Sequence, residues 1–323
     1  MGAAVRAIEA AKNIVLAGHI NPDGDTLGSM IALALGLEQK NKAVTMLSAD
    51  GVPALYDFLP ASERIERTTE RRDFDLAIVL DAGDLSRIGT NQEAALSAPH
   101  LMDIDHHVTA GQFGDVRLLD ATAAATGEIV YDLLIALGCT ITLPIAEALL
   151  CALLTDTGSF RFMNVTPRTM QIAGEMIRIG ASPNTIAEHV FENKPWAAQK
   201  LLGRALDSLQ RSDDGKIVWA HVTQADFADF GGTDAETEGV VNAVRSVEGA
   251  EVALFFREMP SGRARVSLRA RDGFDVSLVA QLFGGGGHRL AAGCSLDGPL
   301  AEAEARLVAE VERRMKAGEA SRE

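Results

Sequence analysis

The chain has 323 residues, of which 47% are hydrophobic, and carries a net charge of -15. This length exceeds that of a usual single core, so two domains are expected. The net negative charge argues against a protein that coats long nucleic acid with a broad basic face. The sequence has neither a targeting segment nor a run of about 18 apolar residues that would span a bilayer. Cys139, Cys151 and Cys294 cannot all pair and lie in apolar or small-residue surroundings, which predicts free thiols and a cytoplasmic protein.

The first segment with a chemical signal joins a strand to a helix. Residues 12–18 form an apolar run that predicts a buried strand, and residues 26–39 carry apolar side chains at helical spacing. The turn NPDGD lies between them, since Asn-Pro and Asp-Gly both break regular structure. His19, Asp23 and Asp25 are therefore expected on a strand-to-helix loop at the carboxyl edge of a sheet.

Two later segments repeat this design. Residues 74–84 and 100–107 each hold an apolar run that ends in acid or histidine, the first at Asp81 and the second at His106 and His107. In a parallel sheet these strand ends lie on one rim, which is where open α/β sheets bind ligands.

A fourth segment adds one more carboxylate. Asp156 follows an apolar stretch and is followed closely by Gly158, so it too is expected in a loop. Mixed imidazole and carboxylate donors suit Mn²⁺ and similar ions better than they suit structural zinc. Four carboxylates would balance two divalent cations, which predicts a two-metal hydrolase. The six candidate ligands are His19, Asp23, Asp25, Asp81, His106 and Asp156.

The remaining elements predict an α/β fold in two domains. Helical patterns should complete the cover of the first, parallel sheet, with helices on both of its faces. A linker helix follows, with Pro195 at its start. Three strands and a final helix then predict a smaller α/β (α+β) domain, with MPSG as the turn between the last two strands. The expected boundaries are 1–190 for the first domain, 191–212 for the linker helix and 213–323 for the second domain.

A basic stretch lies in the second domain. Residues 257–271 contain five arginines and one glutamate, and strand alternation in RARVSLRAR places Arg263, Arg265, Ser267, Arg269 and Arg271 on one face. A solvated strand face is the alternative interpretation. The acidic segment 232–239 is an acidic loop or helix start and has no assigned chemistry.

The chain resembles a known family at these motifs. HINPDGDTLGS, DAGDLSRIG, DHH and DTGSFRF match in order those of the DHH phosphoesterases, and FGGGGHRLAAG resembles the glycine-rich motif of the DHHA1 domain. The agreement of five motifs is specific, whereas a lone DHH tripeptide would be weak. Within this family the chain is most similar to the NrnA-type enzymes, which act on very short RNAs and on 3′-phosphoadenosine 5′-phosphate.

The resemblance implies a role for each residue. One ion would be held by His19, Asp23 and Asp81, and the other by Asp25, Asp81, His106 and Asp156, with Asp81 bridging. His107 and Arg87 would contact the scissile phosphate. Asp105 would orient a neighbour, and Asp84 is either a turn residue or an outer partner of the site. Substrate recognition would rest on Ser267, Arg269, Gly284, Gly285, Gly286, Gly287 and His288.

The resulting expectation is a metal-dependent enzyme that hydrolyses short oligonucleotides, such as pApA or pGpG, and 3′-phosphoadenosine 5′-phosphate. Its cofactors would be two divalent ions, Mn²⁺ first, with Mg²⁺ or Co²⁺ as alternatives. A cyclic-dinucleotide phosphodiesterase and an exonuclease on longer single strands are alternative functions, as are an inorganic pyrophosphatase and a binding protein without catalysis. The expected partners are short nucleotide substrates and a second copy in a homodimer, with no long nucleic acid and no membrane.

Overall fold

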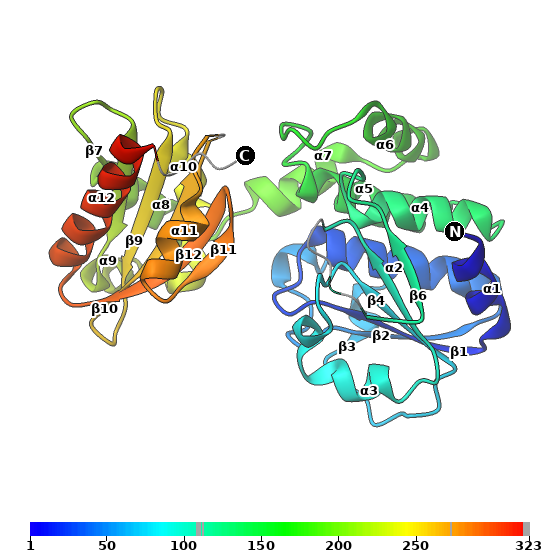
Figure 1. The fold of residues 1–323 in the computed structure, drawn as a ribbon. Coiled ribbons are helices and arrows are strands. Elements are labelled where there is room, and N and C mark those ends of the chain that lie inside the picture. Colours follow the sequence, from blue (N-terminus) through cyan, green and yellow to red (C-terminus); the bar gives the residue numbers. More distant parts are fainter. Residues whose placement is uncertain (108–110, 112, 272, 319–323) are drawn as a thin grey trace. The chain divides into compact units, whose positions relative to one another are not determined.

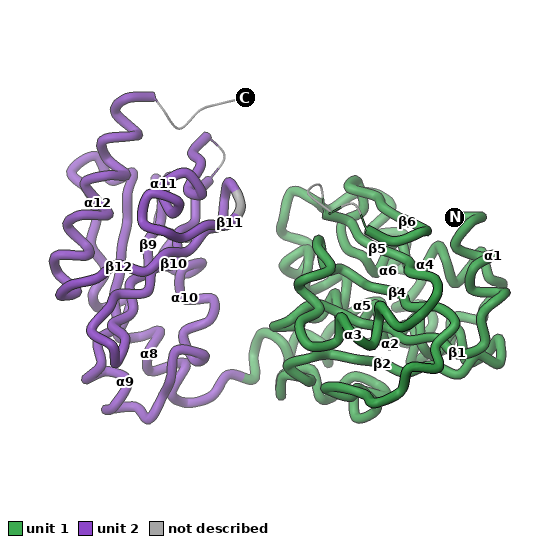
Figure 2. Tube along the Cα trace, turned by 60° about the horizontal axis from the view of Figure 1, so that its bottom comes forward, with its two compact units in different colours: residues 1–193 green, residues 194–323 purple. Residues whose placement is uncertain are grey.

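The computed structural model describes all residues except 108–110, 112, 272 and 319–323. The chain divides into unit 1, Met1–Asn193, and unit 2, Lys194–Glu323 (Figure 2). Each unit is built on its own six-stranded sheet. The helix expected as a linker is α8 (Trp196–Asp207), whose apolar side packs within unit 2. Among the described residues, no helix is long and apolar enough to cross a membrane.

The sheet of unit 1 is parallel throughout, with strand order β3-β2-β1-β4-β5-β6 (Figure 1). Its strands are short and almost wholly apolar, as expected where both faces are covered. They are β1 (Asn13–Gly18), β2 (Ala43–Leu47), β3 (Ile65–Glu66), β4 (Leu76–Leu80), β5 (Leu101–Asp105) and β6 (Val116–Leu119).

Two apolar cores cover the two faces of this sheet. The larger core joins one face to helices that bury nearly continuous apolar stripes, among them α2 and α5. The smaller core joins Val15, Ala17 and Val79 on the opposite face to Ile88 and Ala94. The helices are α1 (Gly2–Ala10), α2 (Gly24–Gln39), α3 (Gln92–Leu96), α4 (Thr126–Ala136), α5 (Leu143–Asp156), α6 (Pro167–Ile179) and α7 (Pro183–Ala187), with the 3₁₀ segment η3 (Leu85–Asn91). The predicted parallel α/β domain with helices on both faces is confirmed.

The sheet of unit 2 is mixed, with strand order β11-β12-β10-β9-β8-β7. Only β8 and β9 are parallel, and the other neighbours are antiparallel. Helices α11 and α12 pack on one face, and α8, α9 and α10 on the other. The remaining bounds are β7 (Gln210–Arg211), β8 (Ile217–Val222), α9 (Gln224–Phe230), α10 (Val240–Arg245), β9 (Val252–Glu258), β10 (Arg263–Ala270), α11 (Val276–Leu282), β11 (Gly286–His288), β12 (Ala291–Asp297) and α12 (Leu300–Ala317).

The topology of unit 1 provides one place for a site. Its strand order runs outward from β1 through β2 to β3, and in the other direction from β4 through β5 to β6. The reversal between β1 and β4 is the switch point at which ligands bind in open α/β sheets. His19 follows β1 and Asp81 follows β4 directly, so both lie at this point.

Candidate metal centre and substrate pocket

The first group of possible metal ligands joins His19, Asp23 and Asp81. The Nε2 atom of His19 lies 3.6 Å from Oδ2 of Asp81 and 3.9 Å from Oδ2 of Asp23. Asp23 is the N-cap of α2, and its Oδ1 atom accepts hydrogen bonds from the N–H groups of Asp25 and Thr26. The capping bonds therefore occupy one carboxylate oxygen and leave the other facing His19.

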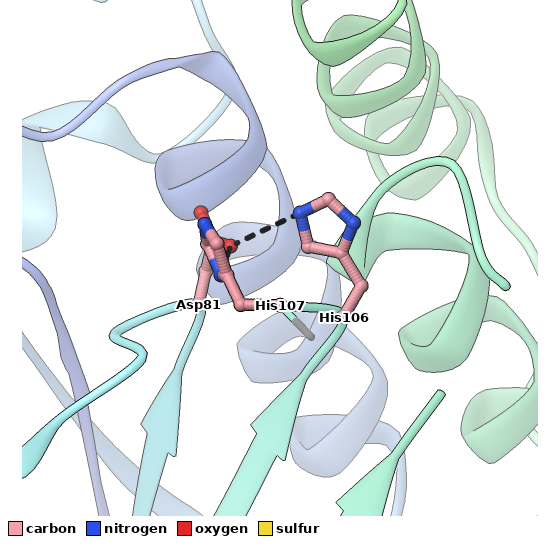
Figure 3. Close-up of side chains that lie close together, drawn as sticks. All are labelled: Asp81, His106 and His107. Carbon is pink, nitrogen blue, oxygen red and sulfur yellow. Dashed lines mark ion pairs between the residues drawn. The ribbon is translucent and has the colours of Figure 1, made fainter. Parts of the chain in front are cut away.

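The second group joins Asp25, His106 and Asp156. The Nε2 atom of His106 lies 3.4 Å from Oδ2 of Asp156 and 3.8 Å from Oδ2 of Asp25. It also lies 3.7 Å from Oδ1 of Asp81, the contact drawn in Figure 3. Asp81 thus presents Oδ2 to the first group and Oδ1 to the second, an arrangement that lets one carboxylate serve two ions.

Backbone carbonyls fix the tautomer of both histidines. Nδ1 of His19 lies 2.7 Å from the carbonyl oxygen of Ile20, and Nδ1 of His106 lies 3.2 Å from that of Ala123. A carbonyl only accepts, so Nδ1 carries the proton and donates in each case. Nε2 of each ring then lies on the side of the carboxylates and would be the ligand atom for a bound metal.

Hydroxyl and N–H groups hold the two most buried carboxylates among the candidate ligands, Asp81 and Asp25. Asp81 accepts from the hydroxyl of Thr26 at 2.8 Å and from that of Thr126 at 3.1 Å. Asp25 accepts from the N–H groups of Thr126 and Gly127 at the start of α4. Asp81 itself has a φ of 58°, a left-handed conformation that residues other than glycine rarely adopt. The position of the Asp81 carboxylate is therefore determined by both backbone and side-chain contacts.

The electrostatics of the group fit divalent cations. Burial, followed by repulsion from Asp81, Asp156 and Asp23, raises the pKa of Asp25 well above its ordinary value. Burial is likewise the main reason that the pKa of Asp156 rises to about 6. Burial alone would lower the pKa of His19, but the hydrogen bond and charge of Asp81 outweigh it and the pKa is raised. Clustered carboxylates that resist joint ionisation are stabilised by added positive charge.

His107 lies at the edge of these groups. Nδ1 of His107 is 2.6 Å from Oδ1 of Asp105 and 3.6 Å from Oδ1 of Asp81. The Asp105 hydrogen bond raises the pKa of His107. Arg87 is exposed in η3, and its carbonyl accepts a hydrogen bond from the N–H of Ile20, the residue after His19. Asp84 caps η3 through Ser86, which is the structural role of a turn residue.

The sequence predicts Asp156 in a loop, and this is wrong: Asp156 is the last residue of α5. Helix α5 extends as far as the site because its apolar side packs closely against α2. At this contact Gly28 has no side chain and leaves room for Ala152. The chain then turns through three successive left-handed residues, Gly158, Ser159 and Phe160, with φ values of 54°, 59° and 60°. The buried hydroxyl of Thr157 accepts from the N–H of Phe160 and stabilises this turn.

A separate pocket of about 490 Å³ lies within unit 2. Ser267, Gly284 and Gly285, three of the predicted substrate residues, line it. They are joined by Arg257, Arg263, Arg265, Val266, Phe283, Gly293, Cys294 and Ser295.

Arg269, Gly286 and Gly287 are not among the described residues that line this pocket. Arg269 is half-buried on β10 and donates to the carbonyl of Leu268. Gly286 and Gly287 belong to β11, which pairs with β12. The backbone of His288 ends β11, and its side chain lies outside the described part of the structure.

Comparison with known proteins identifies the family. Residues 13–154 match the DHH family, N-terminal domain, and residues 200–317 match the DHHA1 domain. The bifunctional oligoribonuclease and PAP phosphatase NrnA of Thermus thermophilus is 32% identical over 287 residues, which is 88% of this chain and 84% of that protein. The chain belongs to the DHH–DHHA1 phosphoesterase family. The Bacillus subtilis protein with the same name is 27% identical over 90% of this chain and 92% of its own length.

Solved structures of the DHH fold agree with this assignment. An exopolyphosphatase-related protein from Bacteroides fragilis superposes with a TM-score of 0.91 at 24% identity, and the match covers 98% of this chain and 97% of that one. RecJ of Thermus thermophilus, solved in complex with Mn²⁺, gives a TM-score of 0.56 at 14% identity and covers 97% of this chain but 54% of that one. These likenesses establish the DHH–DHHA1 fold of both units.

Sequence reasoning about this DHH–DHHA1 chain missed Arg257, which lines the pocket, and Asp234, which pairs with it. Arg257 was counted in the basic stretch but was given no role, and Asp234 lay in the acidic segment without assigned chemistry. The burial of Arg257 could have been expected from its position at the end of the apolar strand VALFF. Its pairing with Asp234 joins residues on different elements, so no local pattern signals it.

Proposed function

We propose that this chain is a two-metal phosphoesterase that hydrolyses short oligoribonucleotides and 3′-phosphoadenosine 5′-phosphate (PAP). The observation that carries the proposal is the position of Asp81, whose two oxygens face two separate donor groups, 3.6 Å from His19 and 3.7 Å from His106. A carboxylate so placed fits the bridging ligand of a pair of ions. Membership of a phosphoesterase family supports the same reading.

His19, Asp23 and Asp81 would hold one ion, and Asp25, Asp81, His106 and Asp156 the other. Oxygen and imidazole donors favour Mn²⁺, with Mg²⁺ or Co²⁺ as alternatives; RecJ, which shares the fold, was solved with Mn²⁺ and also with Mg²⁺. When bound, such ions polarise phosphoryl oxygens and supply a water-derived nucleophile at neutral pH. Hydrolysis would therefore require no nucleophilic side chain from the protein.

The remaining site residues would position the phosphate. His107, protonated more readily because of its hydrogen bond to Asp105, can donate Nε2–H to a phosphoryl oxygen. Arg87 is exposed and can present a planar, permanently charged fork to the same group. In unit 2, the pocket with Ser267, Gly284 and Gly285 would bind a part of the substrate that does not react. Roles for Arg269, Gly286, Gly287 and His288 in binding the substrate stay predictions.

The substrate class follows from relatives and charge. Relatives over most of the chain carry the name oligoribonuclease and PAP phosphatase. The net charge of -15 disfavours a long polyanion, because each added phosphate outside the site meets a repulsive surface. Short substrates avoid most of this repulsion. Two further expectations, a homodimer and a cytoplasmic location, stay predictions, and the three buried free cysteines agree with the second.

Hydrolysis of defined substrates tests the proposal. Protein stripped of metal with a chelator should release no product from pApA or PAP, and added Mn²⁺ should restore hydrolysis of both. Cyclic di-AMP and a long single strand, assayed beside them, should be cleaved far more slowly. If the Mn²⁺-loaded protein cleaves neither pApA nor PAP, the proposed function is wrong.

A further inference from the structure

Asp234 binds two arginines of the pocket in unit 2 at once. It begins the short 3₁₀ segment Asp234–Thr237. Its Oδ1 atom accepts from Nη1 of Arg257 at 3.1 Å, and its Oδ2 atom accepts from Nη1 of Arg265 at 2.6 Å. The side chain of Asp234 is 28% exposed. One partly accessible carboxylate therefore neutralises two of the three cations that line the pocket.

The pairing of strands explains why these charges meet. Arg257 on β9 and Arg265 on β10 lie directly opposite each other in the antiparallel ladder. Like charges in that position repel and destabilise a sheet. An anion placed between them removes the repulsion, and Asp234 supplies it when no ligand is bound.

Arg257 is buried, and its bond to Asp234 leaves other donors of its guanidinium group. Its residue exposure is 8%, and Nη2 donates to the hydroxyl of Ser267 at 2.7 Å. Its Nε–H is buried and has no hydrogen-bond partner within the described residues. An unsatisfied donor on a buried charge is costly, so Arg257 keeps hydrogen-bonding capacity beyond Asp234 and Ser267.

The chemistry of the lining identifies the ligand class. Three arginines, the Ser267 hydroxyl and the glycine backbone at Gly284 and Gly285 are typical of sites for a phosphate group. Arg263 is the third arginine and pairs with Asp297, whose side chain is 84% exposed. No carboxylate is among the lining residues, so a phosphate in the pocket would meet Asp234 as its nearest rival for Arg257 and Arg265.

We propose that Asp234 is a specificity-determining counter-ion that competes with a second, non-reacting phosphate of the substrate for Arg257 and Arg265. This inference rests on the proposed function, because it assumes that the pocket takes part in nucleotide binding. The competition weakens retention of a phosphorylated product. Loss of the 3′-phosphate from PAP, for example, leaves AMP, which keeps its 5′-phosphate and must leave the pocket before the next turnover.

The test measures binding of AMP and adenosine by equilibrium dialysis, with the full chain and with metal chelated. Without metal, the carboxylates of unit 1 repel phosphate, so the difference between the two ligands reports the pocket. Wild type should bind AMP more tightly than adenosine. Asp234→Asn keeps the size of the side chain and removes its charge, so it should tighten AMP binding about tenfold and leave adenosine within about twofold.

Two further variants separate this role from a general change of charge. Asp297→Asn removes the same charge beside the same pocket but from an exposed carboxylate that pairs only with Arg263, so AMP affinity should change by less than about twofold. Arg257→Lys keeps the charge and loses the fork, so it should weaken AMP binding about tenfold.

Three results would overturn the inference. They are weaker AMP binding in Asp234→Asn, equal changes for AMP and adenosine, and equal affinity of the two ligands for wild type. Because the measurement involves no turnover, it stands apart from the assay of pApA and PAP hydrolysis: failure of that assay would reject the proposed function, whereas failure here would reject only the role of Asp234.

Discussion

The side chain of His107 is bonded to the buried carboxylate of Asp105, with Nδ1 and Oδ1 2.6 Å apart. The same Oδ1 atom accepts from the backbone N–H of His107 at 2.8 Å. The Oδ2 atom of Asp105 accepts from the N–H of Gly83, two residues beyond Asp81. Asp105 thereby connects the strand end that carries the two histidines to the loop that carries Asp81.

Asp105→Asn should lower kcat for pApA by about 10–100-fold, because the amide removes the negative charge that orients His107 and raises its pKa. The Nδ2 group of the new amide would also face the N–H of Gly83, so two hydrogen-bond donors would oppose each other. The metal content should stay at the wild-type value, since Asp105 is not among the proposed ligands. Steady-state kinetics and elemental analysis of the same preparation check both statements. A loss of metal together with activity would instead make Asp105 part of the metal centre.

Asp81→Asn, by contrast, should lower the metal content together with the activity. The substitution removes the charge shared by the two donor groups, so metal content should fall from about two ions per chain toward one or none, and turnover should be lost. The fold should persist, because Thr26 and Thr126 can still bond the Oδ1 atom or the amide. Elemental analysis, circular dichroism and the pApA assay give the answer. Near-normal activity with full metal occupancy would refute the bridging role.

Strand ends predicted from sequence which candidate ligands would lie together, because their geometry is general. An apolar run followed by His or Asp places the side chain on one rim whenever the sheet is parallel, and β1, β4 and β5 obey this rule. Asp156 did not follow it, since the end of α5 depends on packing against α2 and not on a local turn signal. Which oxygen of Asp81 faces which histidine also depends on a left-handed φ that no spacing reveals.

The pocket of unit 2 was less accessible to sequence reasoning. Alternation along β10 placed Ser267 on the correct face, but the register of β9 against β10 decides that Arg257 lies opposite Arg265. Register is set by the turn and by packing across the sheet. Asp234 lies on a separate element, so its contact with both arginines exists only in three dimensions.

Asp103 should make unit 1 less stable as pH rises. Its carboxylate is fully buried, and both oxygens lack partners within the described residues. Burial, with a contribution from Asp105, raises its pKa to about 7. Below pH 4 it is protonated in both the folded and unfolded chain. Between pH 4 and pH 7 only the unfolded chain ionises, which costs the folded state on the order of 3–4 kcal/mol.

Asp103→Asn should therefore raise the free energy of unfolding at pH 7 by a few kcal/mol and flatten its dependence on pH between 4 and 7. Urea unfolding followed by circular dichroism at several pH values measures this. Asp57→Asn, which changes an exposed carboxyl in the same unit, is the control and should have little effect. If Asp103→Asn leaves the slope unchanged, Asp103 is already ionised in the folded chain.

Gly158→Ala should impair the site through the turn that follows Asp156. Gly158 has a φ of 54°, and a Cβ there would lie 2.4 Å from the ring of Phe162. The exposed ring of Phe162 could move aside, but an alanine is strained at this left-handed φ, so the turn should relax, Asp156 should lose its alignment with His106, and kcat for pApA should fall at least about tenfold. Gly174→Ala is the control, because a Cβ at that helical glycine meets nothing within 4 Å. Equal, small effects of the two changes would show that the turn does not position Asp156.

The dependence of rate on RNA length tests the central claim most directly. Initial kcat/KM values for labelled RNAs of two, five, ten and 24 nucleotides of one base, with Mn²⁺ at fixed salt, give the profile. A dinucleotide should be cleaved at least about tenfold more efficiently than the 24-mer, which corresponds to about 1.4 kcal/mol of transition-state binding. A flat or rising profile would contradict the account and indicate an exonuclease that acts on longer single strands.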